Sequence, residues 1–326
     1  MKAIRCREFG PPERLDYADI EPLTPGAGQI VLSVKACAVN FPDTLVIQGK
    51  YQFQPPMPFS PGTDVAGVVK SVGAGVETPR PGDRVFALVP HGGYAEEVAL
   101  PAAAATPIPD GVDFVSAAAF QLTYGTAYHA LVDRARIQPS ETLLVLGAAG
   151  GVGLAAVELG KALGARVIAA ASSPEKLAAC RETGADEVID YSTEDLRERI
   201  KTLTGGAGVN VVFDPAGGAL TEPTLRGMAW GGRYLVIGFA TGEIPRIPLN
   251  LPLLKGCSIV GVFYGGLLAQ DPALAQANQR QLVAWLQQGR IKPRVSRTYP
   301  LRDAALALND IAARRAVGKI VLEMGE

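Results

Sequence analysis

Apolar residues along the chain are grouped in short runs, and the spacing of these runs changes near residue 115. Before about residue 105 the runs are rich in valine and are separated by proline and glycine. Such punctuation is typical of strands in a small, mainly β domain. The clearest of these runs lie at 29–36, 65–72, 83–89 and 94–100.

Further along, strand-like and helix-like segments alternate. Residues 115–135 are rich in alanine with helical spacing, and the alternation begins at Thr142. This pattern predicts a parallel, doubly wound α/β sheet. Later strands are expected at 209–213, 232–238 and 258–264, and a helix is expected at 273–288.

Two domains are therefore expected, with the end of the chain returning to the first. Residues 293–300 and 319–323 again have the composition of strands. We predict a mainly β domain over 1–121, an α/β domain over 122–264, and a tail over 265–326 that completes the first domain. A chain of 326 residues, 48% of them hydrophobic, is too long for one small core and suits this division.

The most specific local pattern begins at Thr142, where an apolar run of strand length leads into glycines. The loop reads Ala148-x-Gly150-x-x-Gly153, and a helical segment and a second apolar run follow it. This is a βαβ unit with a dinucleotide-binding fingerprint, although alanine replaces the first glycine. Backbone N–H groups over Ala149, Gly150, Gly151 and Val152 would face the pyrophosphate. A plain strand-to-helix turn is the alternative, but the complete strand–helix–strand order favours nucleotide binding.

The residues after the second strand favour NADPH as the nucleotide. An acidic residue about 20 positions past the glycines normally binds the ribose hydroxyls of NAD. This chain has Ser172 and Ser173 there, and the first carboxylate, Glu175, is followed by Lys176. Two hydroxyls and a lysine suit a 2′-phosphate. The serines could also cap the helix that begins at Pro174, and both roles are compatible.

Charge and cysteine content narrow the functional class. The formal net charge is −1, without runs of like charge, which argues against a nucleic acid or an acidic membrane surface as partner. The four cysteines are widely separated and include no C-x-x-C pair, so neither a disulfide scaffold nor a structural zinc is expected. No apolar run has the form of a signal peptide or a membrane span, and we expect a soluble cytoplasmic enzyme.

Several short motifs, taken together, resemble the medium-chain dehydrogenase/reductases, and most of all their zinc-free quinone oxidoreductase (zeta-crystallin-like) branch. The resemblance covers essentially the whole chain and implies a GroES-like domain followed by a Rossmann domain. The motifs lie at 40–43, 61–64, 81–85, 92–96, 124–128, 147–153, 214–218 and 318–322.

Departures from the zinc-dependent members of that family predict a protein without a metal. In those enzymes a cysteine stands in place of Asn40, and a His-Glu pair in place of Thr63 and Asp64. The residues present cannot rebuild a Cys/His site, and no four-cysteine lobe follows Val89. Cys37 lies near the missing ligand, but a lone thiol is more often a small buried apolar residue.

Without a Lewis acid, hydride addition to a polarised acceptor is easier than alcohol oxidation. The expected reaction is zinc-independent hydride transfer from NADPH to a quinone. Reduction of an activated C=C bond in an α,β-unsaturated carbonyl, such as an enone, a haloacrylate or an enoyl thioester, is a close alternative. A second alternative is a non-catalytic NADPH- or RNA-binding protein of the crystallin type, which the near-neutral charge disfavours.

The resemblance also implies roles for polar residues of the first domain. Asn40 would lie beside the nicotinamide ribose, and Tyr51 would face the substrate and could donate to its carbonyl oxygen, although it could equally be a packing residue. Asp43 and Asp64 are catalytic candidates whose plainer interpretation is loop capping. Lys319 resembles a position close to the cofactor, but a lysine entering a final strand is usually solvated, and we favour that interpretation.

Other positions would contact the cofactor from the second domain. Thr123 resembles a position that contacts the nicotinamide end of the cofactor, with helix N-capping as the alternative. Tyr191 resembles a position beside the 2′-phosphate of the cofactor. The remaining residues would line the nicotinamide pocket, and ordinary packing within the sheet is the alternative. They are Gly217, Gly238, Phe239, Val262, Phe263 and Tyr264.

Two further expectations concern the histidines and the assembly. His129 lies within a helical segment and has the setting of a structural residue, so we expect the proton to come from solvent or Tyr51. Family members commonly pair through the last strand of the Rossmann sheet, here the apolar run 258–263. The expected partners are thus a small-molecule acceptor and a second copy of the chain.

Overall fold

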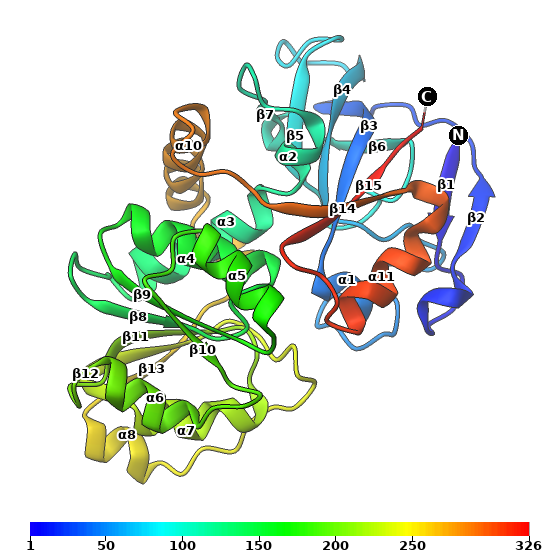
Figure 1. The fold of residues 1–326 in the computed structure, drawn as a ribbon. Helices are drawn as coiled ribbons and strands as arrows, with labels where there is room; N and C mark the ends of the chain where they lie inside the picture. Colours follow the sequence, from blue (N-terminus) through cyan, green and yellow to red (C-terminus); the bar gives the residue numbers. More distant parts are fainter. Residues whose placement is uncertain (326) are drawn as a thin grey trace. The chain divides into compact units, whose positions relative to one another are not determined.

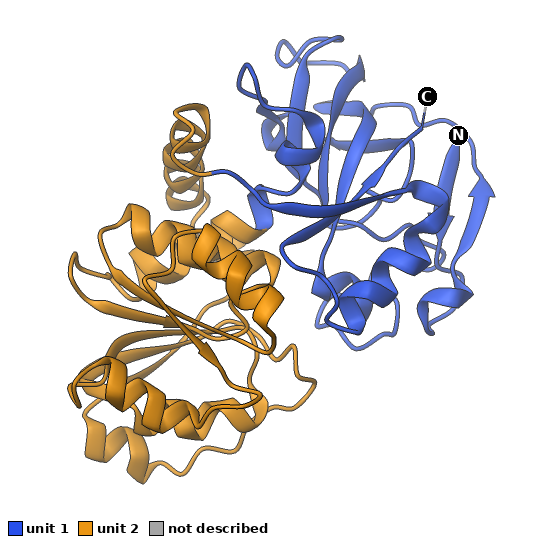
Figure 2. Ribbon diagram, in the orientation of Figure 1, with its two compact units in different colours: residues 1–122, 292–326 blue, residues 123–291 orange. Residues whose placement is uncertain are grey.

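The computed structural model describes residues 1–325 and divides the chain into two compact units (Figure 2). The first unit consists of Met1–Leu122 and the segment that begins at Lys292, and the second consists of Thr123–Ile291. The first boundary is one residue from the expected position. The second falls after residue 291 instead of 264.

The long helix α10, Pro272–Gln287, accounts for this later boundary, because its contacts lie in the second unit. The Trp285 ring meets the Tyr128 ring edge to face, with 5.9 Å between their centroids. Asn278 Nδ2 also donates to the Asp133 carboxylate at 2.7 Å. Only the part of the tail from Lys292 onward belongs to the first unit.

The first unit contains a seven-stranded sheet in the order β14-β15-β3-β4-β5-β7, with β6 paired to β3 (Figure 1). The expected mainly β domain is confirmed, including the return of the C-terminal strand, which pairs antiparallel with β3. The strands of this sheet are β3 Gln29–Val39, β4 Asp64–Val72, β5 Arg84–Leu88, β6 Glu97–Pro101, β7 Thr106–Pro107, β14 Val295–Pro300 and β15 Lys319–Glu323. Strands β1 Lys2–Arg5 and β2 Asp16–Asp19 form a separate two-stranded sheet. The α-helices are α1 Phe41–Val46, α2 Phe114–Ala118 and α11 Ala304–Ala312, with 3-10 turns at Pro12–Arg14, Ala102–Ala104 and Leu301–Asp303.

The second unit contains a six-stranded sheet in the order β10-β9-β8-β11-β12-β13. Each neighbouring pair is parallel, which confirms the doubly wound sheet. The strands are β8 Thr142–Val145, β9 Arg166–Ala171, β10 Glu187–Asp190, β11 Val209–Asp214, β12 Met228–Val236 and β13 Ser258–Gly261. The helices are α3 Gln121–Tyr128, continued by a π-helix over His129–Arg134, α4 Gly151–Ala162, α5 Pro174–Glu182, α6 Leu196–Leu203, α7 Thr221–Arg226, α8 Asn250–Lys255, α9 Tyr264–Gln270 and α10, with a 3-10 turn at Gly218–Leu220.

Strand order in this sheet reverses at β8, which lies between β9 and β11. Figure 1 shows α4 and α5 on one face of the sheet and α6 and α7 on the other. In open α/β sheets, ligands bind at the carboxyl ends of the strands where the order reverses. The loops after β8 and β11 therefore define the edge at which a ligand is expected.

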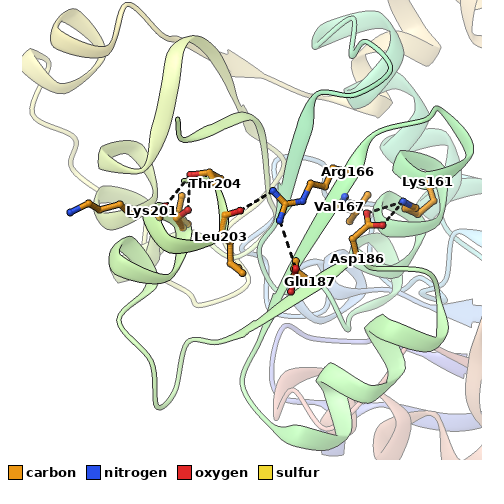
Figure 3. Close-up of polar contacts among 9 residues, drawn as sticks. Lys161, Arg166, Val167, Asp186, Glu187, Lys201, Leu203 and Thr204 are labelled. Atoms are coloured by element: carbon orange, nitrogen blue, oxygen red, sulfur yellow. Dashed lines mark hydrogen bonds and ion pairs between the residues drawn. The ribbon is translucent and has the colours of Figure 1, made fainter. Parts of the chain in front are cut away.

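The opposite, amino-terminal edge of the sheet is held by ion pairs and backbone hydrogen bonds (Figure 3). Lys161 of α4 donates to Asp186 at 2.7 Å, and the same carboxylate accepts from the Val167 N–H of β9 at 2.7 Å. Arg166 donates to the Leu203 carbonyl of α6 at 2.8 Å and lies 3.7 Å from Glu187. These contacts tie two helices to two strands and leave the carboxyl edge for a ligand.

Candidate functional site

The glycine loop after β8 has the geometry of a dinucleotide-binding turn. Gly147 adopts a positive φ of 54°, whereas Ala148 is not among the residues with positive φ, so alanine is tolerated at the departure from the fingerprint. A Cβ at Gly153 would lie 2.6 Å from the Gly147 carbonyl oxygen, which explains the need for glycine there. At Gly150 the nearest atom would be 3.5 Å away, so this face of the loop is open.

Helix α4 begins directly after this loop, and no side chain caps its first turn. Its N-terminus lies at the carboxyl end of β8, and the first backbone N–H groups of a helix have no partner within the helix. Such groups, together with the helix dipole, bind anionic phosphates. The residues present therefore fit a pyrophosphate, which the N–H groups of Gly151 and Val152 at the start of α4 would hold, whereas the Gly150 N–H donates to the Gly147 carbonyl at 3.1 Å.

Ser172, Lys176 and Tyr191 come together at the carboxyl end of β9. Lys176 Nζ donates to Ser172 Oγ at 3.2 Å, and the Tyr191 N–H donates to the Ala171 carbonyl at 3.1 Å. Ser173 Oγ accepts from the Lys176 N–H at 3.4 Å and caps α5, so the capping interpretation is confirmed for Ser173. Ser172 and the Lys176 ammonium remain a fitting pair for a 2′-phosphate.

Asp214 organises the loop after β11, a role that the sequence analysis missed. Its Oδ1 accepts from the Ala216 and Gly217 N–H groups at 2.8 and 2.9 Å, and its Oδ2 accepts from the Tyr234 hydroxyl at 2.5 Å. Burial, and after it the Asp214 charge, raise the pKa of Tyr234, which keeps its hydroxyl protonated as a donor. The signal in the sequence was an aspartate directly before Pro-Ala-Gly-Gly.

The loop that Asp214 holds brings Gly217, Gly238 and Phe239 together. Gly217 has a φ of +68°, and a Cβ there would lie 2.8 Å from the Phe239 ring. The Gly238 N–H donates to the Asp214 carbonyl at 3.3 Å. These three predicted cofactor residues therefore share the carboxyl edge of β11 and β12.

Thr123 does not cap a helix, and residues 262–264 lie outside the strand in which they were expected. Thr123 is 5% exposed and lies inside α3, which begins at Gln121, so its N-capping interpretation is wrong. The expected strand 258–264 ends at Gly261; Phe263 is 56% exposed, and Tyr264 opens α9. The Tyr264 ring lies so close to Gly125 that a Cβ there would be 2.4 Å from its hydroxyl oxygen.

In the first unit, Asn40 and Asp43 form the start of α1. The Asn40 N–H donates to Asp43 Oδ2 at 2.8 Å, and the buried Tyr94 hydroxyl donates to the same oxygen at 2.9 Å. The capping interpretation of Asp43 is therefore confirmed. Burial raises the pKa of Asp43 to about 6, although both hydrogen bonds and the Lys319 charge oppose that rise.

Lys319 is buried, so our interpretation of it as a solvated residue is wrong. It is 4% exposed, its Nζ donates to Asn40 Oδ1 and, at 3.4 Å, to the Val39 carbonyl, and Asp64 Oδ2 lies 3.9 Å away. The reason is topological. Strands β15 and β4 both pair with β3, which places the ends that carry Lys319 and Asp64 beside Asn40.

The electrostatics of this cluster favour a bound proton near neutral pH. Burial raises the pKa of Asp64 to about 7, with the Lys319 charge opposing and the Asp43 charge adding to the rise. Burial lowers the pKa of Lys319, and the charges of Asp64 and Asp43 oppose that fall. Two buried carboxylates share one ammonium, so full ionisation leaves an uncompensated negative charge.

Tyr51, Cys37 and His129 have simpler environments. Tyr51 is half-buried against the hydrophobic core of the first unit; burial and the nearby Asp43 charge raise its pKa. Cys37 is fully buried, which confirms the interpretation of a small apolar residue, and burial raises its pKa well above the ordinary value. His129 Nδ1 lies 2.7 Å from the Asp133 carboxylate, and this buried pair confirms a structural role.

Residues 1–325 show neither a cluster of metal-binding side chains nor a membrane-spanning helix. No group of three or more histidine, cysteine, aspartate and glutamate side chains there is arranged to hold a metal ion. Among the helices of the same residues, none combines the length and the apolar character needed to cross a lipid bilayer.

Comparison with known proteins identifies the family. Residues 26–110 match the alcohol dehydrogenase GroES-like domain, and residues 151–286 match the zinc-binding dehydrogenase family. The quinone oxidoreductase-like protein 2 homolog of Nematostella vectensis is 40% identical over 98% of this chain and 88% of its own length. The rat quinone oxidoreductase is 37% identical over 99% of this chain and 97% of its own length.

A solved structure agrees with these relatives. Escherichia coli quinone oxidoreductase complexed with NADPH is 32% identical to this chain and has a TM-score of 0.92. The match covers 99% of this chain and 100% of that one. The chain therefore belongs to the medium-chain dehydrogenase/reductases, in their zinc-free, quinone oxidoreductase-like branch. It is an oxidoreductase with a GroES-like domain and a Rossmann domain.

The buried carboxylates predict a stability that falls as the pH rises. Their pKa values of about 6 and about 7 in the folded protein exceed the ordinary 3.8, so the folded chain retains protons that the unfolded chain has released. This stabilisation is complete below about pH 4 and is lost as the pH rises through 6 and 7. We expect the melting temperature, followed by circular dichroism, to decrease between about pH 5 and 8.

The variant Asp64→Asn should flatten this decrease, because it removes the group whose proton is lost last. The exposed Asp110→Asn is the matched control and should keep the wild-type slope. A wild-type melting temperature that rises over the same interval would contradict the assignment.

Proposed function

We propose that the protein is an NADPH-dependent quinone oxidoreductase that transfers hydride without zinc. The observation that carries the proposal is the Lys319 ammonium beside Asn40 and Asp64, the positions where the zinc-dependent enzymes have metal ligands. A fixed positive charge there repels a divalent cation, and the side chains around it offer no Cys/His set. This supports chemistry that needs an activated acceptor instead of a Lewis acid.

NADPH would supply the hydride, and the second unit has groups suited to each part of it. The first N–H groups of α4 would bind the pyrophosphate, and Ser172, Lys176 and Tyr191 the 2′-phosphate. Thr123 and the loops after β11, β12 and β13 would line the nicotinamide end. The name of the E. coli relative, a quinone oxidoreductase complexed with NADPH, supports the same assignment.

The first unit would supply the polar groups that act on the reacting end. Asn40 would accept a hydrogen bond from the cofactor ribose, and Tyr51 would donate one to the acceptor oxygen, where charge collects during hydride addition. Burial keeps the Tyr51 hydroxyl protonated, as a donor must be. Asp43 would position Asn40 through its backbone N–H, and Asp64 would pair with Lys319. Either carboxyl group could also hold a proton near neutral pH.

Acceptor specificity is tested by measuring NADPH oxidation with 1,4-benzoquinone, 9,10-phenanthrenequinone, an aliphatic enone and crotonyl-CoA. We expect turnover with the quinones, a preference for NADPH over NADH, and no effect of a chelator. Turnover of the enone or the thioester without the quinones would instead assign the protein to C=C reduction. Tight NADPH binding without any turnover, together with retention of AU-rich RNA on filters, would favour the non-catalytic alternative.

Nucleotide preference is tested with Lys176→Met. Loss of the ammonium should raise the KM for NADPH about tenfold or more, the equivalent of about 1.4 kcal/mol or more, and leave the KM for NADH nearly unchanged. Arg181→Met is the matched control, because it removes an exposed positive charge from the other end of α5. Equal effects of Lys176→Met on both nucleotides would refute the role in binding the 2′-phosphate.

We also propose a homodimer that pairs through β13, an edge strand of the Rossmann sheet. Large apolar side chains on and around this edge are exposed, which is typical of an interface. They are Trp230, Ile244, Leu249, Leu253, Leu254, Ile259 and Phe263.

Light scattering during size exclusion tests the dimer. We expect twice the chain mass for the wild type and a single chain mass for Ile259→Lys, because a lysine on an edge strand blocks pairing. Leu306→Lys, at an exposed apolar residue of α11 in the other unit, should remain dimeric. A wild-type mass equal to one chain would exclude the proposal.

A further inference from the structure

Tyr234 of β12 is buried in the second unit, but its hydroxyl reaches a carboxylate at the carboxyl edge of the sheet. The strand register pairs Asp214 with Val236, and Tyr234 lies two residues before Val236. Side chains two residues apart in a strand share a face, so Tyr234 and Asp214 lie on the same face of the sheet. The tyrosine is 1% exposed within the hydrophobic core, and its hydroxyl donates to Asp214 Oδ2 at 2.5 Å.

The Asp214 carboxylate is held from two sides. Its Oδ1 accepts from the N–H groups of Ala216 and Gly217 in the loop after β11, at 2.8 and 2.9 Å. Its Oδ2 accepts from Tyr234 and, at 3.4 Å, from the buried Thr221 hydroxyl. These four hydrogen bonds use the acceptor sites of the carboxylate. The donors on Oδ2 therefore fix the direction in which Oδ1 meets the loop.

Backbone hydrogen bonds extend this arrangement to the loop after β12. The Ala240 N–H donates to the Pro215 carbonyl, and the Thr241 N–H donates to the Ala216 carbonyl, both at 3.0 Å. Gly218 has a φ of +64°, and a Cβ there would lie 2.7 Å from Thr241 Oγ1. The two loops are thus so closely packed that a displacement of one would displace the other.

We propose that Tyr234 is a positioning residue whose hydroxyl, acting through Asp214, fixes these two loops so that Gly217 and Phe239 are held in place for the nicotinamide half of NADPH. This inference rests on the proposed function, in which Gly217 and Phe239 lie at the nicotinamide end. The half of the nucleotide that carries the 2′-phosphate is assigned to other segments, the first turn of α4 and the carboxyl end of β9. Loss of the Tyr234 hydroxyl should therefore weaken binding of one half of the cofactor and spare the other.

Calorimetric titration of Tyr234→Phe with NADPH and with adenosine 2′,5′-bisphosphate tests this proposal. The second ligand has the adenosine and the 2′-phosphate of NADPH but lacks the nicotinamide. We expect the Kd for NADPH to rise about tenfold, because a hydrogen bond to a charged group is lost, and the Kd for the bisphosphate to stay within about twofold of the wild type. An unchanged Kd for NADPH, or an equal rise for both ligands, would overturn the proposal.

Tyr299→Phe is the matched control. The Tyr299 hydroxyl also donates to a carboxylate, Asp310 Oδ2, at 2.5 Å, but both residues belong to the first unit. This variant loses a similar hydrogen bond and should leave both Kd values unchanged. If it weakened NADPH binding as much as Tyr234→Phe does, the effect would come from lost stability and the positioning role would be refuted.

Hydrogen–deuterium exchange of the protein without ligand measures the loops directly. In Tyr234→Phe we expect the N–H groups of the two loops to exchange about tenfold faster, and the glycine loop at 147–153 to keep the wild-type rate. The reporting N–H groups are those of Ala216, Gly217, Ala240 and Thr241. Wild-type exchange at all four positions would contradict the proposal. If Tyr234→Phe does not fold, Thr221→Val, which removes the weaker donor to the same oxygen, is used for both measurements, with smaller changes expected.

Failure of this proposal and failure of the proposed function give different results. A wild-type protein that binds neither ligand would refute the binding of NADPH, and with it any role of Tyr234 in holding the nicotinamide. A wild type that binds both ligands, together with a Tyr234→Phe variant that binds both equally well, would refute the role of Tyr234 alone.

Discussion

Burying a polar or charged group costs free energy unless a partner meets it, and both units are arranged around groups of this kind. In the first unit, Asp43 meets Tyr94 and the Asn40 N–H, and Lys319 meets Asn40 with Asp64 nearby. These contacts join α1 to strands β3, β4 and β15. When β15 pairs with β3, Lys319 must therefore be placed where it can contact Asn40 and Asp64.

In the second unit, the two edges of the sheet differ in how their polar groups are satisfied. At the amino edge, Asp186 satisfies both Lys161 and the Val167 N–H, so polar groups there have partners within the protein. At the carboxyl edge, the first turn of α4 has no side-chain cap. The backbone N–H groups in this turn therefore lie where the strand order reverses, which is where folds of this class bind a ligand.

Asp214 shows how a buried carboxylate can hold a loop at the carboxyl edge of the sheet. By accepting from two loop N–H groups and the Tyr234 hydroxyl, it holds the chain in the turn that requires positive φ at Gly217. This places Gly217 against Phe239. The structure thus connects a residue inside the sheet to a surface that is proposed to contact the nicotinamide.

The sequence by itself determined the class of fold and the glycine loop, because both depend on local patterns. The short valine-rich runs, the βαβ order and the glycines at 150 and 153 follow from backbone rules that act over a few residues. Ser173 as a helix cap is equally local. The tertiary structure decided the rest: the burial of Lys319, the ion-pair distance to Asp64, the place of α10 in the second unit and the role of Asp214. Each depends on pairing between segments far apart in the chain, such as β15 with β3, and local spacing carries no information about such contacts.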